Sequence, residues 1–446
     1  MYYNGTMFDR SMEKDFINWK DNAYRKPLIL RGARQVGKTS LIRKFGLENF
    51  DQLIEVNLEK RDQRQLFDQA TSVDDFIKRI DLLFDQTVVP GTTLLFIDEI
   101  QESKNVMELL RFFAEEKPEL HVMAAGSLLE AKIGRDWSIP VGRVEYRYLY
   151  PLTFFEYLKA RKKTALLEAV ETIQLGDLFA YGGLAGELFK EYVMVGGMPE
   201  VVKSFIETGD YSQTRAIFNR LQTAYLDDIG KYSKSKENNK YLELVLEYGP
   251  RVAGTIFKYE NFGGSNYRSR EMGDAVQTVE KVMLLKQVLA VNSTSLPITP
   301  KNIRPKKMIW LDVGLANFVN NAYREMLVGE YQGKIMEQVV GQSLLAGLTT
   351  RPFDLFYWSK DRDEGSAEVD FCFQHQSRLV GMEIKSGNVS QMKSLFSLGS
   401  IDPTVSLVRV SWDDLKNETW KFSGKEYKVL SIPFYLIDRW QDFLMQ

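Results

Sequence analysis

The chain contains few of the side chains that bind zinc or form disulfides. Its 446 residues include one cysteine, Cys372, and two histidines, His121 and His375. A single cysteine excludes an intramolecular disulfide framework and is typical of proteins in a reducing compartment. Because structural zinc sites are built mainly from cysteine and histidine, we expect no zinc site of that kind.

Long apolar runs and a strong net charge are also absent. No apolar run approaches the roughly 18 residues that a membrane helix requires, and the N-terminus is acidic and polar instead of basic and then apolar. We therefore expect a cytoplasmic protein with no membrane partner. The formal net charge is −2, so only a local basic patch could attract nucleic acid.

The composition that is present is that of a globular protein, with 44% hydrophobic and 26% charged residues. A chain of 446 residues is too long for one ordinary core. The length therefore predicts two to four domains.

A phosphate-binding loop is predicted near the start of the chain. The apolar run Pro27–Leu30 leads into Gly32-x-x-x-x-Gly37-Lys38-Thr39, and a helical pattern follows. The glycines let the backbone turn tightly, and loop N–H groups and the helix N-terminus favour phosphate. We expect Lys38 to reach the β- and γ-phosphates of ATP and the Thr39 hydroxyl to ligate Mg²⁺. The alternative is a glycine-containing turn with a chance lysine. The predicted nucleotide-binding residues are Gly32, Ala33, Arg34, Gln35, Val36, Gly37, Lys38, Thr39 and Ser40.

A second motif follows a buried strand. The unbroken apolar run Thr93–Ile97 is typical of a strand covered on both faces of a parallel sheet, and it ends in Asp98 and Glu99, at the edge where such sheets bind ligands. We expect Asp98 to hold Mg²⁺ together with Thr39, and Glu99 to orient or deprotonate the attacking water. The alternative is a pair of solvated acids after a strand.

Two further residues are candidates for the same site. Ser127 follows the apolar run Leu120–Ala125 and could contact the γ-phosphate or the water, or cap a helix beginning at Leu128. Arg143 could neutralise transition-state charge, in cis or from a neighbouring subunit of a homo-oligomer. The alternative for Arg143 is an ordinary surface arginine.

The order of several motifs resembles that of a known family. Gly-Ala-Arg-Gln-Val-Gly-Lys-Thr, Phe-Ile-Asp-Glu-Ile-Gln, Ala-Gly-Ser, Val-Gly-Arg-Val and Pro-Leu-Thr-Phe-Phe-Glu occur in this order, followed by Gly196-Gly197-Met198-Pro199-Glu200 and Trp310-Leu311-Asp312. Up to about residue 390, the chain resembles a prokaryotic family of AAA-type ATPases whose second half is a domain of unknown function. The resemblance implies an α/β fold: an AAA-type P-loop core with a parallel sheet over residues 1–150 and a helical lid over 151–210.

A helical module with a wing is expected over residues 211–320. Helical patterns there are followed by two extended segments, 287–291 and 307–311, with the basic cluster Lys301–Lys307 between them. Helices followed by a basic hairpin suggest a winged helix whose wing lies near DNA or RNA backbone. The alternative is a solvated hairpin. In the preceding lid region, Gly182-Gly183 and Gly196-Gly197 are expected to form turns.

The last region, 321–446, is expected to be an α/β domain. Asp370 lies on an alternating strand, and Glu383 and Lys385 share one face of the next strand because they are two residues apart. With Glu337 on a preceding helix, the set resembles the restriction-endonuclease-like (PD-(D/E)xK) nucleases. The resemblance implies that Asp370, Glu383 and Glu337 hold Mg²⁺, with Lys385 beside a water or a phosphate oxygen. The alternative is a salt bridge between Lys385 and either acid. Edge strands are expected at 406–410 and 427–436, and a closing helix at 437–444.

The sequence leaves two functions open. The first is an ATP-hydrolysing protein that acts on nucleic acid through a Mg²⁺-dependent nuclease-like domain. The second is an ATP-gated regulatory module whose C-terminal domains bind a protein partner and cleave nothing.

Overall fold

The chain folds into two compact units. The computed structural model describes residues 7–127, 142–177, 179–232, 238–360, 367–387 and 392–444. The first unit comprises Met1–Pro151 with Lys281–Met283 and Leu348–Pro352, and the second comprises Leu152–Glu280, Leu284–Gly347 and Phe353–Gln446. Within the described residues, no helix has both the length and the apolar character needed to span a membrane.

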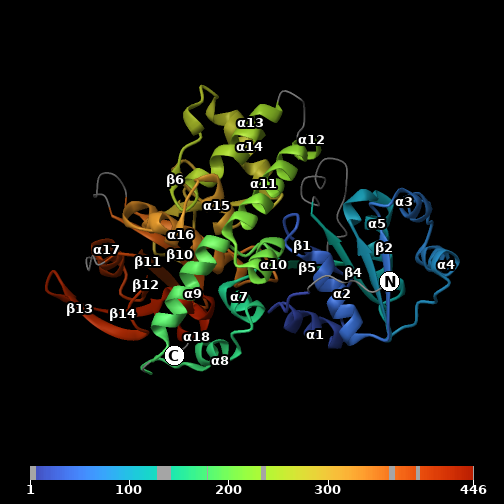
Figure 1. Ribbon diagram of the computed structural model, residues 1–446, viewed down its shortest axis with the longest axis horizontal. Helices are drawn as coiled ribbons and strands as arrows, with labels where there is room; N and C mark the ends of the chain where they lie inside the picture. Colours follow the sequence, from blue (N-terminus) through green and yellow to red (C-terminus); the bar gives the residue numbers. More distant parts are fainter. Residues whose placement is uncertain are drawn as a thin grey trace. The chain divides into compact units, whose positions relative to one another are not determined.

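The first unit is built on a five-stranded parallel sheet, as the sequence predicts (Figure 1). The strand order is β2-β3-β4-β1-β5, so β4 lies between the strand that precedes the P-loop and the strand that ends in Asp98. The strands in chain order are β1 (Leu28–Arg31), β2 (Gln52–Asn57), β3 (Thr93–Asp98), β4 (His121–Gly126) and β5 (Glu145–Tyr148). β3 and β4 are buried throughout, which explains their unbroken apolar sequences.

Helices cover both faces of this sheet. On one face, apolar side chains of α3, α4 and α5 form a single core with alternate residues of β2, β3 and β4. On the other face, α1 packs on α2 through Phe16 and Phe45, whose ring centroids are 5.2 Å apart. The helices are α1 (Glu13–Asp21), α2 (Lys38–Asn49), α3 (Arg61–Phe67), α4 (Val73–Phe84) and α5 (Lys104–Glu116).

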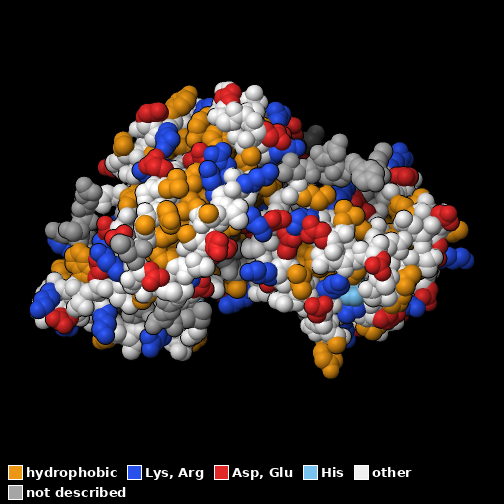
Figure 2. All heavy atoms as spheres, turned by 60° about the horizontal axis from the view of Figure 1, so that its bottom comes forward, with side chains coloured by type: hydrophobic (Ala, Val, Ile, Leu, Met, Phe, Trp, Pro, Cys, Tyr) orange, Lys and Arg blue, Asp and Glu red, His pale blue; other side chains and the backbone are white. Residues whose placement is uncertain are grey.

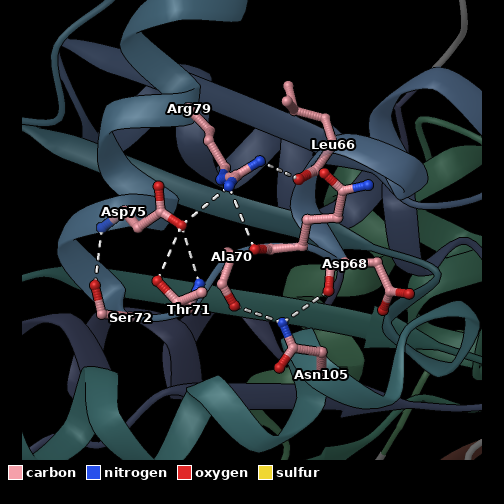
Figure 3. A network of polar contacts seen from close by, with 9 residues as sticks. Leu66, Asp68, Ala70, Thr71, Ser72, Asp75, Arg79 and Asn105 are labelled. Carbon is pink, nitrogen blue, oxygen red and sulfur yellow. Dashed lines mark hydrogen bonds and ion pairs between the residues drawn. The ribbon is translucent and has the colours of Figure 1, made fainter.

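Polar contacts fix the connection between α3 and α4 (Figure 3). Arg79 of α4 donates from Nη1 to the carbonyl of Leu66 at 2.8 Å. Asn105 of α5 donates from Nδ2 to the carbonyls of Asp68 at 3.0 Å and Ala70 at 2.7 Å. These bonds satisfy carbonyl groups that the helix ends leave free, and they anchor the helix that follows β3 and Asp98.

The second unit begins with helices, several of them amphipathic. Gly196 ends α9 with φ +74°, which confirms the expected turn there. The turn expected at Gly182-Gly183 is wrong, because these residues begin α9. Glycine is tolerated there, since the first N–H groups of a helix have no intrahelical partner. The helices are α7 (Phe154–Ala160), α8 (Thr164–Thr172), α9 (Gly182–Val195), α10 (Pro199–Thr208), α11 (Tyr211–Asp227), α12 (Ile229–Tyr232), α13 (Asn239–Tyr248), α14 (Ser269–Lys281), α15 (Val313–Val319), α16 (Gly329–Ala346), α17 (Lys393–Ile401) and α18 (Trp440–Leu444).

A nine-stranded mixed sheet completes the second unit. Its strand order is β13-β14-β12-β11-β10-β9-β7-β8-β6. The expectation that 406–410 and 427–436 are edge strands is wrong, because β12 and β14 are internal and β13 forms that edge. The strands are β6 (Ile256–Phe257), β7 (Leu285–Val291), β8 (Lys306–Trp310), β9 (Phe356–Ser359), β10 (Glu368–His375), β11 (Arg378–Lys385), β12 (Ser406–Ser411), β13 (Lys416–Phe422) and β14 (Lys425–Pro433).

The two extended segments expected to form a wing do pair, as the antiparallel strands β7 and β8. β7 also pairs in parallel with β9, so the same sheet continues into the strands that carry Asp370 and Glu383. The expected basic wing is wrong in one respect, because Lys307 is only 1% exposed and forms ion pairs inside the unit. On the face seen in Figure 2, lysine and arginine side chains are interspersed with aspartate and glutamate.

Candidate functional site

The P-loop connects β1 to α2 through a strained turn. Gln35 and Gly37 have φ of 65° and 98°, in the left-handed region that favours glycine. A Cβ atom on Gly32 would lie 2.5 Å from the carbonyl oxygen of Leu149, so only glycine fits there. The Lys38 ammonium donates to the carbonyls of Gly32 at 3.0 Å and Ala33 at 2.8 Å. The lysine is thus held inside the loop that is expected to receive the phosphates.

Lys38 is buried beside two carboxylates. Burial lowers the pKa of Lys38 to about 8, and the negative charges of Glu99 and Asp98 oppose this decrease. A triphosphate placed against the loop would add negative charge near the ammonium and favour its protonated form. The lysine therefore suits an anionic ligand.

Thr39 and Asp98 bring the two sequence motifs together. The Thr39 hydroxyl donates to Asp98 Oδ2 at 3.0 Å and lies 3.3 Å from Oδ1. Burial raises the pKa of Asp98 to about 6, with a further contribution from the charge of Glu99. Mg²⁺ prefers carboxylate and hydroxyl oxygens, and a cation here would offset the cost of burying the Asp98 charge. The residues present therefore fit Mg²⁺.

Glu99 has an unusual backbone conformation. Its φ of 52° is in the left-handed region, which is uncommon for a residue other than glycine and is often found at functional sites. Gln101 donates from Nε2 to Glu99 Oε2. Gln101 belongs to the Phe-Ile-Asp-Glu-Ile-Gln motif, but no role was expected for it, because its contact with Glu99 depends on the short 3₁₀ helix Ile100–Glu102.

Ser127 lies at the carboxyl end of the parallel sheet. It directly follows β4, between the P-loop strand and the Asp98 strand. Its side chain is buried, and its Oγ atom has no hydrogen-bond partner among the described residues. The helix that Ser127 was expected to cap, from Leu128, lies outside the described residues.

Arg143 lies at the opposite end of the neighbouring strands β1 and β5 from the P-loop. The register pairs Leu28 with Glu145 and Arg31 with Tyr148, so Arg143 precedes the start of β5 while the P-loop follows the end of β1. At about 3.3 Å per residue, the four residues of β1 separate the two ends of the strands by roughly 13 Å. Arg143 is half-exposed and pairs with Glu115 at 2.6 Å. This geometry argues against the cis role and leaves the role in a neighbouring subunit open.

Arg10 is a candidate for positioning the P-loop that was not predicted from the sequence. Its guanidinium is buried and donates to the carbonyl of Val36 in the P-loop at 3.1 Å and to the carbonyl of Tyr150 at 2.6 Å. No motif in the sequence marks this arginine, because its partners are backbone atoms far along the chain.

A second cluster of charged residues lies in the nine-stranded sheet. The β10–β11 register pairs Phe371 with Met382, so Asp370 and Glu383 lie one step beyond that pair on neighbouring strands. Asp370 Oδ2 accepts from the backbone N–H of Ile384 at 2.8 Å. The Lys385 ammonium pairs with Glu383 Oε1 at 2.6 Å, which is the salt bridge of the alternative interpretation.

Glu337 of α16 joins this cluster through Lys307, which sequence reasoning did not include. The Lys307 ammonium lies 2.6 Å from Glu337 Oε2 and 3.4 Å from Asp370 Oδ1. Burial would lower the pKa of Lys307, but Asp370 and Glu337 raise it above its ordinary value. Burial, and then the charge of Asp370, raise the pKa values of both Glu337 and Glu383.

The C-terminal carboxylates do not form a ready metal site. Among the described residues, no group of three or more His, Cys, Asp or Glu side chains is arranged to hold a metal ion. Glu383 Oε2 is buried and has no hydrogen-bond partner there. The expected Mg²⁺ set of Asp370, Glu383 and Glu337 is thus brought into one region but is interleaved with Lys307 and Lys385.

Comparison with known families identifies the first part of the chain. Residues 24–158 match the model of an AAA domain, so the chain carries a P-loop domain of the AAA type. Residues 186–325 and 332–434 each match a domain of unknown function (DUF8612 and DUF4143). No curated protein matches the chain.

Solved structures resemble the chain only weakly. The RuvB Holliday junction branch migration motor of Thermotoga maritima is 16% identical, with a TM-score of 0.31, over 63% of this chain and 90% of that one. The Aeropyrum pernix ORC1 protein in complex with DNA is 12% identical, with a TM-score of 0.30, over 71% and 93%. PCH-2 of C. elegans is 10% identical, with a TM-score of 0.29, over 46% and 65%. Likeness this weak bears on neither activity nor partners.

Proposed function

We propose that the chain binds ATP with Mg²⁺ and hydrolyses it. The observation that carries this proposal is the hydrogen bond between Thr39 and Asp98, which joins the P-loop to the end of β3 across 59 residues. The match of residues 24–158 to an AAA domain supports it.

Each residue of the site has a proposed role. Lys38 holds the β- and γ-phosphates, and Thr39 and Asp98 hold Mg²⁺, which when bound neutralises charge on the phosphate oxygens. Glu99 accepts a proton from, or orients, the attacking water, and Gln101 fixes the Glu99 carboxylate through the hydrogen bond to its Oε2 atom. Ser127, directly after β4, presents a hydroxyl that has no hydrogen-bond partner among the described residues. The remaining loop residues contribute mainly backbone N–H groups.

Two substitutions test this proposal by separating binding from turnover. Lys38→Ala removes a charge that faces the phosphates, so ATP affinity should fall. Glu99→Gln should retain affinity but lose turnover by about a hundredfold or more, because only the partner of the water changes. Glu102→Gln is the matched control, since Glu102 is close in sequence but pairs with Arg64. Hydrolysis by Glu99→Gln at the wild-type rate would remove Glu99 from the mechanism.

We propose further that the second unit is a regulatory, partner-binding module and not a nuclease. Both lysines of the carboxylate cluster already form ion pairs with the acids that a cleavage site needs for Mg²⁺. Lys307, from the expected wing, is buried and not available to a phosphate backbone. These observations favour the alternative in which ATP gates the binding of a protein partner.

Cleavage of nucleic acid is the competing function, and the neighbouring positions of Asp370 and Glu383 favour it. The two functions separate in one assay. The pure protein is incubated with labelled DNA and with labelled RNA, with Mg²⁺ or Mn²⁺, with and without ATP. We expect intact nucleic acid in every arm. Metal-dependent cleavage by the wild type that Asp370→Asn abolishes would establish the nuclease instead.

A further inference from the structure

The Lys307 ammonium lies against three oxygen atoms of the kinds that also bind metal ions. Its three nearest acceptors are Glu337 Oε2 at 2.6 Å, the backbone carbonyl of Asp370 at 3.2 Å and Asp370 Oδ1 at 3.4 Å. An ammonium group has three donors and no acceptor, so these three oxygens match its full capacity. Two carboxylates and one carbonyl are also the ligands that a hard divalent cation would take.

The position of the lysine is enforced by the fold. Lys307 lies on β8, Glu337 on α16 and Asp370 on β10, so three separate elements meet at the ammonium. The side chain is 1% exposed, and its Nζ atom lies 5.1 Å from the centre of the Phe371 ring. If this lysine turned outward, the partly buried carboxylates of Glu337 and Asp370 would lose its positive charge, which is costly.

One oxygen of the Asp370 carboxylate is already used by a backbone N–H group. Asp370 Oδ2 is already engaged by the N–H of Ile384, so Oδ1 is the oxygen that faces the shared position. Glu368, two residues before Asp370 on β10, adds negative charge near Lys307. A divalent cation that bridged Glu337 and Asp370 would need the volume that Nζ occupies.

We propose that Lys307 is a resident counter-ion that takes the place of a divalent metal between Glu337 and Asp370. The resemblance to the nuclease fold implies a metal at these acids, and the residues present do not fit one between Glu337 and Asp370 while the Lys307 ammonium lies there. The C-terminal cluster is thus a latent cation site that is occupied by the ammonium of Lys307, and Lys307 lies on β8, a strand that carries none of the nuclease-like residues. The inference deepens the proposal of a non-cleaving second unit, and it is tested separately because metal binding is measured without nucleic acid.

The test is titration of the nucleotide-free full-length protein with Mn²⁺ in a calorimeter. The single variant Asp370→Asn should give the same Mn²⁺ isotherm as the wild type. Lys307→Met, which keeps the length of the side chain and removes its charge, should gain a Mn²⁺ site. Its affinity should exceed that of the wild type by about a hundredfold or more, because a like charge no longer repels the metal. The added site should disappear in the double variant Lys307→Met, Asp370→Asn.

Lys306→Met is the matched control, because Lys306 is the neighbouring residue but lies over the Tyr259 ring, away from the acids. It should bind Mn²⁺ as the wild type does. A folded Lys307→Met protein without an added site overturns the proposal, as does wild-type Mn²⁺ binding that Asp370→Asn abolishes. If Lys307→Met does not fold, comparing the Mn²⁺ isotherms of the wild type and Asp370→Asn still tests the proposal.

Discussion

Asp312 Oδ2 accepts a hydrogen bond from the backbone N–H of Gly197 at 2.7 Å, across 115 residues of sequence. Asp312 Oδ1 also accepts from the N–H of Leu315 at 3.0 Å and so caps α15. One buried carboxylate therefore links the Gly-Gly-Met-Pro-Glu segment to the start of a helix. Burial raises the pKa of Asp312 to about 6, and the N–H donors oppose that increase. The two motifs that carried part of the family resemblance thus meet at one structural contact.

Close packing at this contact predicts that Gly197→Ala is strongly destabilising. A Cβ atom on Gly197 would lie 2.1 Å from the carbonyl oxygen of Leu152, which is backbone and cannot move aside cheaply. We expect the free energy of unfolding to fall by about 3 kcal/mol, measured from urea denaturation midpoints. Gly183→Ala is the control, since nothing lies within 4 Å of its Cβ position. Equal stability of the two variants would contradict the packing argument.

The core of the first unit was predictable because its signals are local. The apolar runs that form β3 and β4 each lie within a few consecutive residues, and the structure confirms that β3 is a buried strand of a parallel sheet. The P-loop spacing also lies within one short segment. Parallel pairing then brings strand ends together at one edge, so the proximity of Thr39 and Asp98 follows from topology.

The features that were missed depend on contacts distant in sequence. Lys307 belongs to a basic run, which on its own indicates an exposed surface, and only the folding of α16 and β10 around it buries the charge. The β13 segment has few apolar residues because it is an exposed edge strand, and so it gave no strand signal. Arg10 bonds to backbone carbonyls, which any sequence provides.

Arg10→Ala is expected to weaken ATP binding. The substitution removes two charge-assisted hydrogen bonds, one of them to the P-loop carbonyl of Val36, so the loop loses a support that holds it in shape. We expect ATP affinity to fall about tenfold, as measured by fluorescent-nucleotide titration. Arg25→Ala is a matched control, because Arg25 also donates to two backbone carbonyls, those of Asn22 and Glu119, away from the loop. An unchanged affinity in Arg10→Ala would show that the arginine does not position the P-loop.

The raised pKa of Asp98 predicts a gain in stability from Asp98→Asn. In the folded state the pKa is about 6, above the ordinary value of 3.8, so the folded protein binds this proton more tightly than the unfolded chain does. The ionised carboxylate therefore lowers stability above about pH 6, and that cost is relieved as the pH falls through this value toward 3.8. Nucleotide-free Asp98→Asn should melt at a higher temperature than the wild type at about pH 8, and the difference should shrink toward about pH 4. A lower melting temperature at about pH 8 would show that the ionised Asp98 stabilises the fold.

Arg143 lies at the other end of β1 and β5 from its own P-loop, so we expect any role in hydrolysis to be in the site of a neighbouring subunit. If Arg143 acts in this way, ATP turnover per subunit should rise with protein concentration. Arg143→Ala should then reduce turnover about a thousandfold without weakening nucleotide binding. Arg111→Ala is the matched control, since Arg111 pairs with the same carboxylate, Glu115, at 3.1 Å, and is comparably exposed. Loss of an ion pair with Glu115 would affect both variants alike, whereas loss of a catalytic charge would affect only Arg143→Ala. Turnover that is independent of concentration and unchanged in Arg143→Ala would make this residue an ordinary surface arginine.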